Sequence, residues 1–383
     1  MSNWRAPNRI TSRVVIPHPD EPGVELVGTL EQLVDLPTPA GPRPIALILH
    51  GVMGHKDYLW QKTLAHSLPL DSFRFDFRGN HESGGRWNYA GFLDEVRDLE
   101  AVVRYLNAGS RYRVALIVAH SRGSIGAFHW LCTSPLAGQV SAYVNITARF
   151  RMDKVYNKAG FAPEDRVPGQ DYFEWKEVVA RKPRVERVYQ SDIDTFAKWQ
   201  SDIVEHAFPK HIHVLTLHGL ADDLVFPTDA VLYYRALSNR GSDRGTSTIY
   251  LVHGANHNFQ NDRNVIVRAV LGWLDIPRSQ RQTGVFLDVP SQQTSLLTGL
   301  AGEVVLDDVV ESFSRIEREK MAQAEHGADR HAHFSQSPRQ AVTRHPVPLL
   351  SFFLATTPYR HHNQHCTLLN IFHLPLSRYL GLS

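Results

Sequence analysis

The fold is decided by residues 114–124, which read VALIVAHSRGS. The first six residues of this stretch are continuously apolar, as expected of a strand that is buried on both faces of a sheet. Ser121 follows at once and opens a helix-prone stretch over 124–132. The pattern small-x-Ser-x-Gly, placed between a strand and a helix, predicts a sharp turn at the serine. Such a turn lifts the serine hydroxyl out of the sheet.

An alternation of strands and helices extends on both sides of this stretch. Strands are predicted at 13–16, 25–31, 45–49, 72–75, 114–119, 140–146, 213–217 and 247–252. Between them, apolar residues recur at helical spacing over 92–106 and 265–274. Strands joined by helical crossovers run parallel, so the sequence predicts an α/β fold on a mostly parallel sheet with flanking helices.

Residues 147–209 break this alternation. They are helix-prone, rich in charged and aromatic residues, and carry no convincing strand pattern. An insertion of this kind, between two strands of the sheet, is expected to form a helical cap over a substrate crevice.

The alternation ends at Pro277, which predicts one domain over 1–277 and a C-terminal extension over 278–383. Residues 306–316 have the pattern of one amphipathic helix, and the remainder is expected to be partly disordered. Apolar residues at 347–354 and 368–380 could contact a partner or a membrane. The alternative is that the extension has no role.

Composition excludes several functional classes. The 383 residues include 41 basic and 39 acidic ones, and a net charge of +2 does not predict nucleic-acid binding. Two cysteines are too few for a disulfide framework and lack metal-site spacing. The N-terminus has no apolar signal segment, and no apolar stretch approaches the ~20 residues of a membrane span. We therefore expect a cytoplasmic protein without stable membrane insertion; its oligomeric state does not follow from the sequence.

A serine hydroxyl is a weak nucleophile, which needs a base that is oriented by a third group. Asp222 and Asp223 follow the strand predicted at 213–217, and His257 follows the next strand. Serine, aspartate and histidine then occur in the chain order of one class of hydrolases. We expect His257 to be the base and prefer Asp222 as the acid, while Asp223 remains an alternative that could instead face solvent or cap.

Three other histidines adjoin strand ends or turns, namely His120, His218 and His253. Each lies outside the position expected of the base, so a structural role is the simpler interpretation. For the oxyanion of an acyl-transfer reaction, the best donors are the backbone amides of Arg122, directly after the nucleophile, and of Val52. The alternative for Val52 is an ordinary glycine turn at residues 50–54, which read HGVMG.

Several blocks together resemble a known family. They are LHGVMG at 49–54, FRFDFRGNHESGG at 73–85, the Ser121 turn, the Asp222 loop and GANH at 254–257. From about residue 10 to residue 274 the chain resembles α/β-hydrolases of the serine-esterase type, close to the cinnamoyl-esterase-like and serine aminopeptidase-like branch. The resemblance implies an eight-stranded, mostly parallel sheet, a short helical cap, a Ser121–His257–Asp222 triad and no metal or organic cofactor.

The chain departs from this family at three positions. Ala119 and Ser124 stand where glycine is usual around the nucleophile, and His81 stands where glycine is frequent in the loop over 76–85. In the family that loop is structural, and it lacks the Gly-Lys-Ser/Thr ending of a phosphate-binding loop. None of the departures removes a predicted catalytic group.

These observations predict a serine hydrolase that cleaves carboxylic esters of small molecules through an acyl-enzyme. Aromatic residues of the cap, Tyr172, Phe173, Trp175 and Trp199, suggest small to medium or aromatic acyl groups, although each could equally form the core of the cap. The alternatives are a peptidase or thioesterase that uses the same triad, and a non-catalytic binding protein on the same scaffold.

Overall fold

The protein is described by a computed structural model that divides into two compact units, Met1–Thr294 and Ser295–Ser383. Side chains and backbone are described for residues 7–34, 40–157, 160–238, 240, 245–286 and 315, and the backbone alone for 287–288, 295–297, 356–359 and 366–369. The first unit carries the predicted sheet and all of the predicted site residues.

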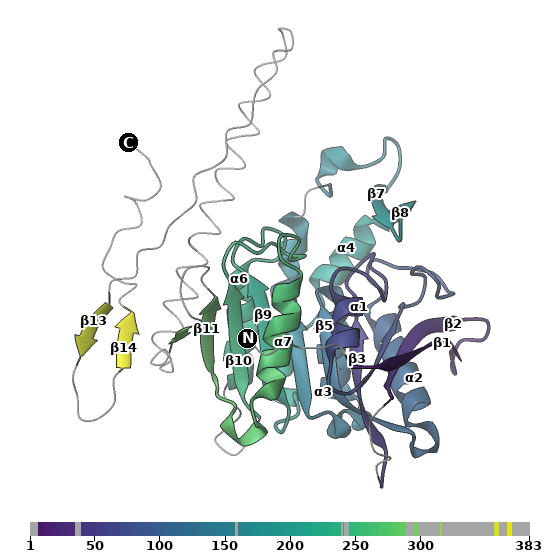
Figure 1. Ribbon diagram of the computed structural model, residues 1–383. Coiled ribbons are helices and arrows are strands. Elements are labelled where there is room, and N and C mark those ends of the chain that lie inside the picture. The colour runs from purple at the N-terminus through teal and green to yellow at the C-terminus, as the bar shows by residue number, and fades with distance from the viewer. Residues whose placement is uncertain are drawn as a thin grey trace, which may run out of the picture. The chain divides into compact units, whose positions relative to one another are not determined.

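All eight predicted strands are present in the first unit (Figure 1). They are β1 (Arg9–Pro17), β2 (Glu25–Leu33), β3 (Arg43–Leu49), β4 (Asp71–Phe75), β5 (Tyr112–His120), β6 (Ala142–Ile146), β9 (His213–Gly219) and β10 (Ser247–Val252). They lie side by side in the order β1-β2-β4-β3-β5-β6-β9-β10. The pairs β1–β2 and β2–β4 are antiparallel, and every pair from β4 onward is parallel. The expectation of a mostly parallel sheet is confirmed.

Helices cover both faces of this sheet. The helices are α1 (Gln61–Ser67), α2 (Phe92–Asn107), α3 (Arg122–Thr133), α6 (Pro227–Ser238) and α7 (Asn264–Asp275). One apolar core joins the sheet to α2, α3 and α6, and a second core on the opposite face joins it to α1 and α7. Because β3 and β5 are buried on both faces, they read as unbroken apolar runs in the sequence.

The sheet continues past the predicted boundary at residue 277. Strand β11 (Gly284–Asp288) pairs in parallel with β10, with Ile249 opposite Val285. The strand is short, and only a three-residue 3₁₀ turn at Arg278–Gln280 lies between it and α7. The alternation of strands and helices on which the prediction rested therefore does not extend to this strand.

The second unit contains β12 (Ser295–Leu297) and an antiparallel pair, β13 (Thr356–Tyr359) and β14 (Cys366–Leu369). Most of the predicted extension over 278–383, including the expected helix at 306–316 and nearly all of both apolar runs, lies outside the described residues.

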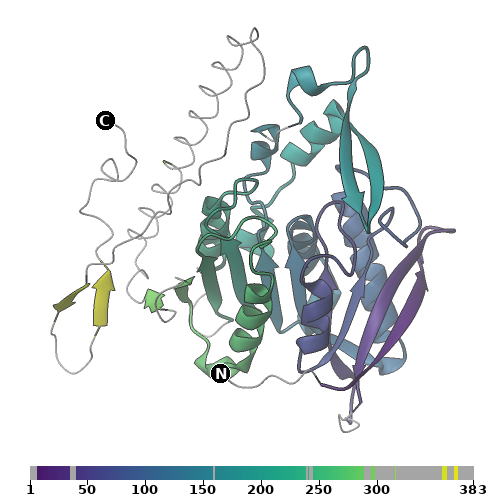
Figure 2. The same cartoon turned by 45° about the horizontal axis from the view of Figure 1, so that its top comes forward.

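The segment between β6 and β9 is inserted where the sequence predicted a cap, but it is not wholly helical. It contains a β-hairpin, β7 (Tyr172–Val179) and β8 (Lys182–Tyr189), followed by α4 (Gln190–Ala197) and α5 (Ile203–Ala207). Figure 2 shows the hairpin and α4 rising beyond one end of the parallel strands. The expectation of a segment without strands was wrong.

The hairpin escaped prediction because its turn lacks the usual residues. Ala180 and Arg181 both adopt positive φ angles, 48° and 66°, where hairpin turns favour Asn-Gly or Gly. The alternation of Phe173, Trp175 and Val179 with polar residues was the available signal, and charged residues on both strands obscured it.

None of the helices in the described part of the chain is long and apolar enough to cross a membrane.

Candidate active site

Ser121 occupies a strained turn between β5 and α3. Its φ and ψ angles are 52° and −119°, a conformation that residues other than glycine rarely adopt. Its amide donates to the Ile146 carbonyl at the end of the neighbouring β6, at 2.7 Å. Gly123 permits the turn, because a methyl group there would lie 2.3 Å from the His50 carbonyl oxygen. The turn places Ser121 at the carboxyl ends of the parallel strands.

Three side chains from separate loops meet at this point. Nε2 of His257 lies 2.9 Å from Oγ of Ser121, and Nδ1 of His257 lies 2.8 Å from Oδ2 of Asp222. Ser121 and His257 keep 9% and 7% of their surface exposed, and Asp222 keeps none. A hydroxyl, an imidazole and a carboxylate therefore form one hydrogen-bonded line, in the order that serine deprotonation requires.

The loops that carry the acid and the base lie against each other. The amides of Leu220 and Ala221 donate to the carbonyls of Val252 and Ala255, at 2.9 and 3.0 Å. Gly219 makes this approach possible, because a methyl group there would lie 2.1 Å from the Ala255 oxygen. The parallel pairing of β9 with β10 and this glycine together bring two distant stretches of sequence into contact.

Asp222 is held in its ionised form. Its Oδ1 accepts the amides of Leu224 and Val225 at 3.0 and 2.9 Å, and its Oδ2 faces His257 and, at 3.2 Å, Nε2 of His218. Burial opposes ionisation, but the charge of His257 and hydrogen bonds from both histidines hold the pKa of Asp222 well below its usual range. An ionised Asp222 keeps the proton on Nδ1 of His257 and leaves Nε2 free to accept one.

Two further histidines, His218 and His120, contact the acid and the base but are not part of the predicted triad. Nε2 of His218 also lies 2.7 Å from the Val225 carbonyl, so this ring fixes the loop of the acid. Burial, helped by the charge of His257, lowers the pKa of His120 to about 3, so this ring is neutral and its Nε2 donates to the His257 carbonyl at 3.1 Å. The sequence pointed to structural roles for both residues, but it did not reveal that they contact the acid and the base.

The two predicted oxyanion donors lie on the expected turns. Among the residues that the structure describes, none accepts a hydrogen bond from the amide of Val52 or of Arg122. Gly51 brings the first of these turns close to the nucleophile, because a methyl group on Gly51 would lie 3.1 Å from Cβ of Ser121. Both amides are therefore available for a group that binds beside the hydroxyl.

His50 fixes the turn that carries Val52. Burial lowers the pKa of His50 to about 4, so the ring is neutral at physiological pH. Its Nδ1 donates to the Gly51 carbonyl at 2.7 Å, and its Nε2 accepts the Phe77 amide at 3.0 Å. These two contacts assign the tautomer and tie the turn to the loop after β4.

The side chain of Arg122 points away from the turn and contacts α2 and the loop before it. Its Nε donates to Glu95 at 2.7 Å, its other nitrogens reach the carbonyls of Asn88 and Tyr89, and its guanidinium lies 4.5 Å from the ring centre of Phe92. This network anchors α3 to α2, which leaves only the amide of Arg122 at the turn.

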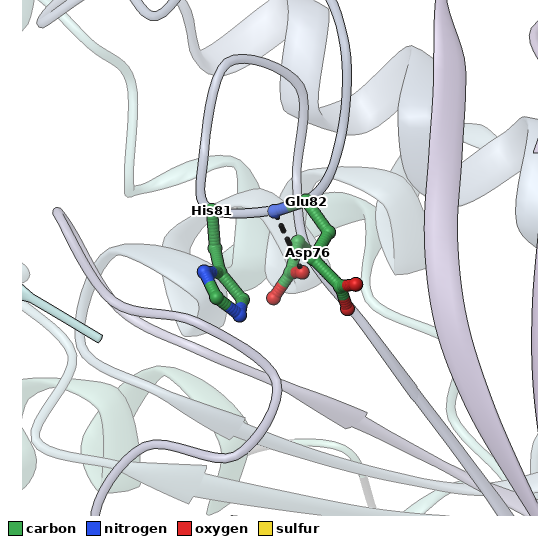
Figure 3. A group of neighbouring side chains, drawn as sticks. All are labelled: Asp76, His81 and Glu82. Atoms are coloured by element: carbon green, nitrogen blue, oxygen red, sulfur yellow. Dashed lines mark hydrogen bonds between the residues drawn. The ribbon is translucent and has the colours of Figure 1, made fainter. Parts of the chain in front are cut away.

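A possible metal site lies in the loop after β4 (Figure 3). Ligand atoms of Asp76, His81 and Glu82 all lie within 4.8 Å of one another. Nζ of Lys56 lies 2.6 Å from Oδ2 of Asp76 and also pairs with Glu82, while the Lys56 amide occupies Oδ1 of Asp76 at 2.6 Å. Because Lys56 pairs with both carboxylates and Arg13 also pairs with Glu82, at 3.3 Å, two cations already balance the two acidic groups, and these residues fit an ion-pair cluster that fixes the loop rather than a metal site.

Each departure from the family pattern is accommodated locally. The hydroxyl of Ser124 donates to the carbonyl of Ala119 at 2.7 Å, and Ala119 is fully buried. His81 keeps the positive φ angle, 44°, that glycine adopts easily. None of the three disturbs the contact between Ser121 and His257.

The cap aromatics pack against one another and against the body of the unit. Trp175 contacts Trp87, Tyr89 and Phe161, and Phe173 contacts Phe161. The remaining pairs are Tyr172 with Tyr189, and Trp199 with Phe92 and with His129. Phe173 belongs to the apolar core, and Trp175 and Trp199 pack against it, whereas Tyr172 is half-buried beside Tyr189. These contacts give the aromatic residues a structural role, so their presence alone does not support an aromatic acyl group.

Comparison with solved structures identifies the architecture. Esterase Est1E of Butyrivibrio proteoclasticus with bound ferulic acid superposes with a TM-score of 0.54 at 16% identity, over 68% of this chain and 97% of that chain. DcsB in complex with a substrate analogue gives 0.51 at 14% identity, over 69% and 97%. Esterase Pf2001 of Pyrococcus furiosus gives 0.50 at 15% identity, over 72% and 94%.

No family model matches the sequence, and no curated protein matches it either. The similarity to the solved structures therefore lies in the course of the backbone, at 14–16% sequence identity. Strand order, crossover helices, the inserted cap and these structural neighbours agree, and the chain has the α/β-hydrolase fold.

Proposed function

We propose that this protein is a serine hydrolase that cleaves carboxylic esters, with Ser121 as nucleophile, His257 as general base and Asp222 as the acid that orients the base. One observation carries the proposal: the continuous line from Ser121 Oγ to His257 Nε2 and from His257 Nδ1 to Asp222 Oδ2, at 2.9 and 2.8 Å. The backbone likeness to solved esterases supports the choice of reaction.

In the first half of the reaction His257 Nε2 takes the proton of Ser121 as Oγ attacks the ester carbonyl. The amides of Val52 and Arg122 donate to the oxyanion of the tetrahedral intermediate, and Asp222 stabilises the imidazolium. The protonated His257 then gives its proton to the departing alcohol, which leaves an acyl group on Ser121.

In the second half His257 removes a proton from a water molecule, which attacks the acyl carbonyl. A second tetrahedral intermediate uses the same two amides. Its collapse returns the proton from His257 to Ser121 and releases the carboxylic acid.

Labelling with a fluorophosphonate, followed by mapping of the modified residue, tests the assignment directly. We expect modification of Ser121 in the wild-type protein and none in Ser121→Ala. The same variant should lose at least ~10⁴-fold in hydrolysis of p-nitrophenyl acetate, because no other group supplies the nucleophile. Its far-ultraviolet circular dichroism should be unchanged. Undiminished hydrolysis by a clean preparation of Ser121→Ala would remove the assignment.

Parallel assays of esters, thioesters and peptide amides distinguish carboxylic ester hydrolysis from the thioesterase and peptidase reactions that the same triad permits. Labelling without turnover of any substrate would favour the binding-protein interpretation. We also propose a cytoplasmic location, because two cysteines are too few for the disulfide framework that is common in exported proteins. Fractionation of cells that express the tagged chain tests it.

A further inference from the structure

A buried arginine close to the predicted triad has no acidic partner among the residues that the structure describes. Arg149 lies three residues after β6, whose last residue, Ile146, accepts the amide of Ser121. Only 7% of the surface of Arg149 is exposed. Its Nη2 donates to the carbonyl of Leu224 at 2.6 Å, in the loop that begins with Asp222. The guanidinium thus lies between the strand end beside the nucleophile and the loop of the acid.

Four of the five other buried arginines of the unit have their charge or their donors satisfied within the described part of the chain; the fifth, Arg281, donates to two backbone carbonyls and stacks on Trp273, while its Nη1 has no partner among the described residues. Arg74, Arg78 and Arg122 each form an ion pair with a buried carboxylate. Arg240 has no carboxylate partner, but it donates to four backbone carbonyls. Arg149 makes one hydrogen bond from its guanidinium within the described part of the chain.

The acidic residue that contacts the two residues after Arg149 is already paired. Asp229 accepts the amides of Phe150 and Arg151, both at 2.7 Å, and pairs with the Arg151 guanidinium at 2.7 Å. Arg149 cannot share this carboxylate without breaking that arrangement. Nε and Nη1 of Arg149 make no hydrogen bond within the described part of the chain, and neither atom is fully buried. Both nitrogens therefore keep contact with solvent.

The backbone of Arg149 is firmly placed. Its carbonyl accepts the hydroxyl of Tyr233 at 2.9 Å, and the amide of Thr147 donates to Leu217 at 3.0 Å. Tyr89 lies near enough that the charge of Arg149 offsets part of the rise that burial causes in the pKa of its phenol. A guanidinium held rigidly with free donors is suited to bind a carboxylate through two parallel hydrogen bonds.

We propose that Arg149 binds a carboxylate of the substrate, so that the preferred esters are those of dicarboxylic acids or other esters that carry a free carboxylate. The low exposure of Arg149 strengthens such a pair, because little water is left to screen it once the substrate covers the guanidinium, and a neutral substrate would displace that water without supplying a charged partner. The inference rests on the proposed esterase function and specifies the substrate of the same site.

Matched substrate pairs test the proposal on the full-length chain. Monomethyl esters of straight-chain dicarboxylic acids, from succinate to suberate, are compared with the methyl esters in which a primary amide replaces the free carboxylate. At the best chain length we expect the carboxylate ester to have the higher kcat/KM by about tenfold or more. Equal rates across the whole series would overturn the proposal.

Variants separate substrate binding from a positioning role. R149Q should lower kcat/KM for the carboxylate esters by about 10- to 100-fold, chiefly through KM, and change the amide esters by less than about threefold. R149K keeps the charge but loses the planar fork and should show an intermediate preference. R104Q, at an exposed arginine paired with Glu100, is the control for a lost positive charge. An equal loss on both substrate series would show that Arg149 only positions the Asp222 loop.

Failure of this inference is distinguishable from failure of the proposed function. Fluorophosphonate labelling of Ser121 together with hydrolysis of the amide esters shows an active esterase, whatever its charge preference. Circular dichroism establishes folding of each variant, and if R149Q does not fold, R149K together with the wild-type substrate ratio decides the question. Turnover that is insensitive to the free carboxylate in both proteins would then overturn the carboxylate site alone.

Discussion

Asp76 and Asp222 are two fully buried aspartates at strand ends of one sheet, and they differ in their partners. Asp76 follows β4 and is paired with the ammonium group of Lys56 at 2.6 Å. Asp222 follows β9 and is paired with the imidazole of His257 at 2.8 Å. The ammonium carries its charge permanently, whereas an imidazole can gain and lose a proton near neutral pH.

The difference teaches which buried carboxylates can take part in chemistry. A carboxylate beside a permanent cation is neutralised throughout and fixes a loop, as the Lys56 cluster does. A carboxylate beside an imidazole stabilises the charged form of that ring, which in the proposed reaction is the form that arises as the serine is deprotonated. In the proposed reaction Asp222 would therefore lower the energy of a transient state, whereas Asp76 stabilises the folded state.

Parallel substitutions at the two aspartates should have opposite consequences. Asp222→Asn should lower kcat for ester hydrolysis by about 10⁴-fold, because the amide favours the wrong tautomer of His257, with little loss of stability. Asp76→Asn should cost roughly 3 kcal/mol of unfolding free energy, because it leaves the ammonium of Lys56 under-compensated, and kcat per folded molecule should change little. Urea unfolding and active-site titration with a fluorophosphonate measure both quantities.

The comparison would fail if the two variants behaved alike. A large loss of kcat in fully folded Asp76→Asn would show that the Lys56 cluster contributes to the reaction. A large loss of stability in Asp222→Asn with normal kcat would show that Asp222 serves the fold.

A second contrast lies within α3. Gly123→Ala should cost about 2–3 kcal/mol, because the new methyl group would lie 2.3 Å from the His50 carbonyl, and it should also reduce kcat by displacing the turn of Ser121. Gly126→Ala, three residues along the same helix, has its nearest contact at 4.0 Å and should gain up to about 1 kcal/mol. Thermal unfolding monitored by circular dichroism compares them, and equal stabilities would refute the close approach.

The sequence predicted the elements whose signals are local. The strands at 45–49 and 114–119 are predicted by unbroken apolar runs and the other six by short β-prone runs, while helical spacing of apolar residues predicts α2 and α7. The candidate triad was predictable because each of its members directly follows a strand, and the carboxyl ends of parallel strands share one edge of the sheet.

The remaining features depend on contacts between distant residues, which a single sequence does not display. Asp222 and Asp223 follow each other after β9, and the sequence pattern does not show which of them contacts the histidine. In the structure Asp222 is buried and contacts His257. The β7–β8 hairpin turns through Ala180 and Arg181 without a glycine. No sequence pattern distinguishes Arg149 from the other arginines, because whether a guanidinium has an acidic partner depends on its neighbours in the fold.

The neutral histidines around the triad predict how stability responds to acid. Burial lowers the pKa of His120 to about 3 from 6.5, so below pH 6.5 the unfolded chain binds a proton that the folded chain refuses. Stability should therefore fall as the pH falls, by about 2 kcal/mol between pH 7 and pH 5 for this residue. His120→Gln cannot titrate, so its unfolding free energy in urea should fall by about that much less over the same interval.

Two aspects of the measurement isolate His120. His50, whose pKa is lowered to about 4, contributes in the same direction in both proteins and cancels in the difference. An identical pH dependence in wild type and His120→Gln would mean that His120 is free to protonate in the folded state.

The smallest effect is expected at the neighbour of the acid. Asp223 is exposed, whereas Asp222 is fully buried and contacts His257, so Asp223→Asn should change kcat/KM by less than about twofold. This variant removes the same charge one residue away from Asp222→Asn, and it therefore controls for any general electrostatic effect on the loop. A loss comparable to that of Asp222→Asn in the p-nitrophenyl acetate assay would reverse the two assignments and make Asp223 the acid. Near-wild-type activity, beside an inactive Asp222→Asn, would show that contact with the imidazole, and not the presence of a negative charge nearby, determines which aspartate serves the reaction.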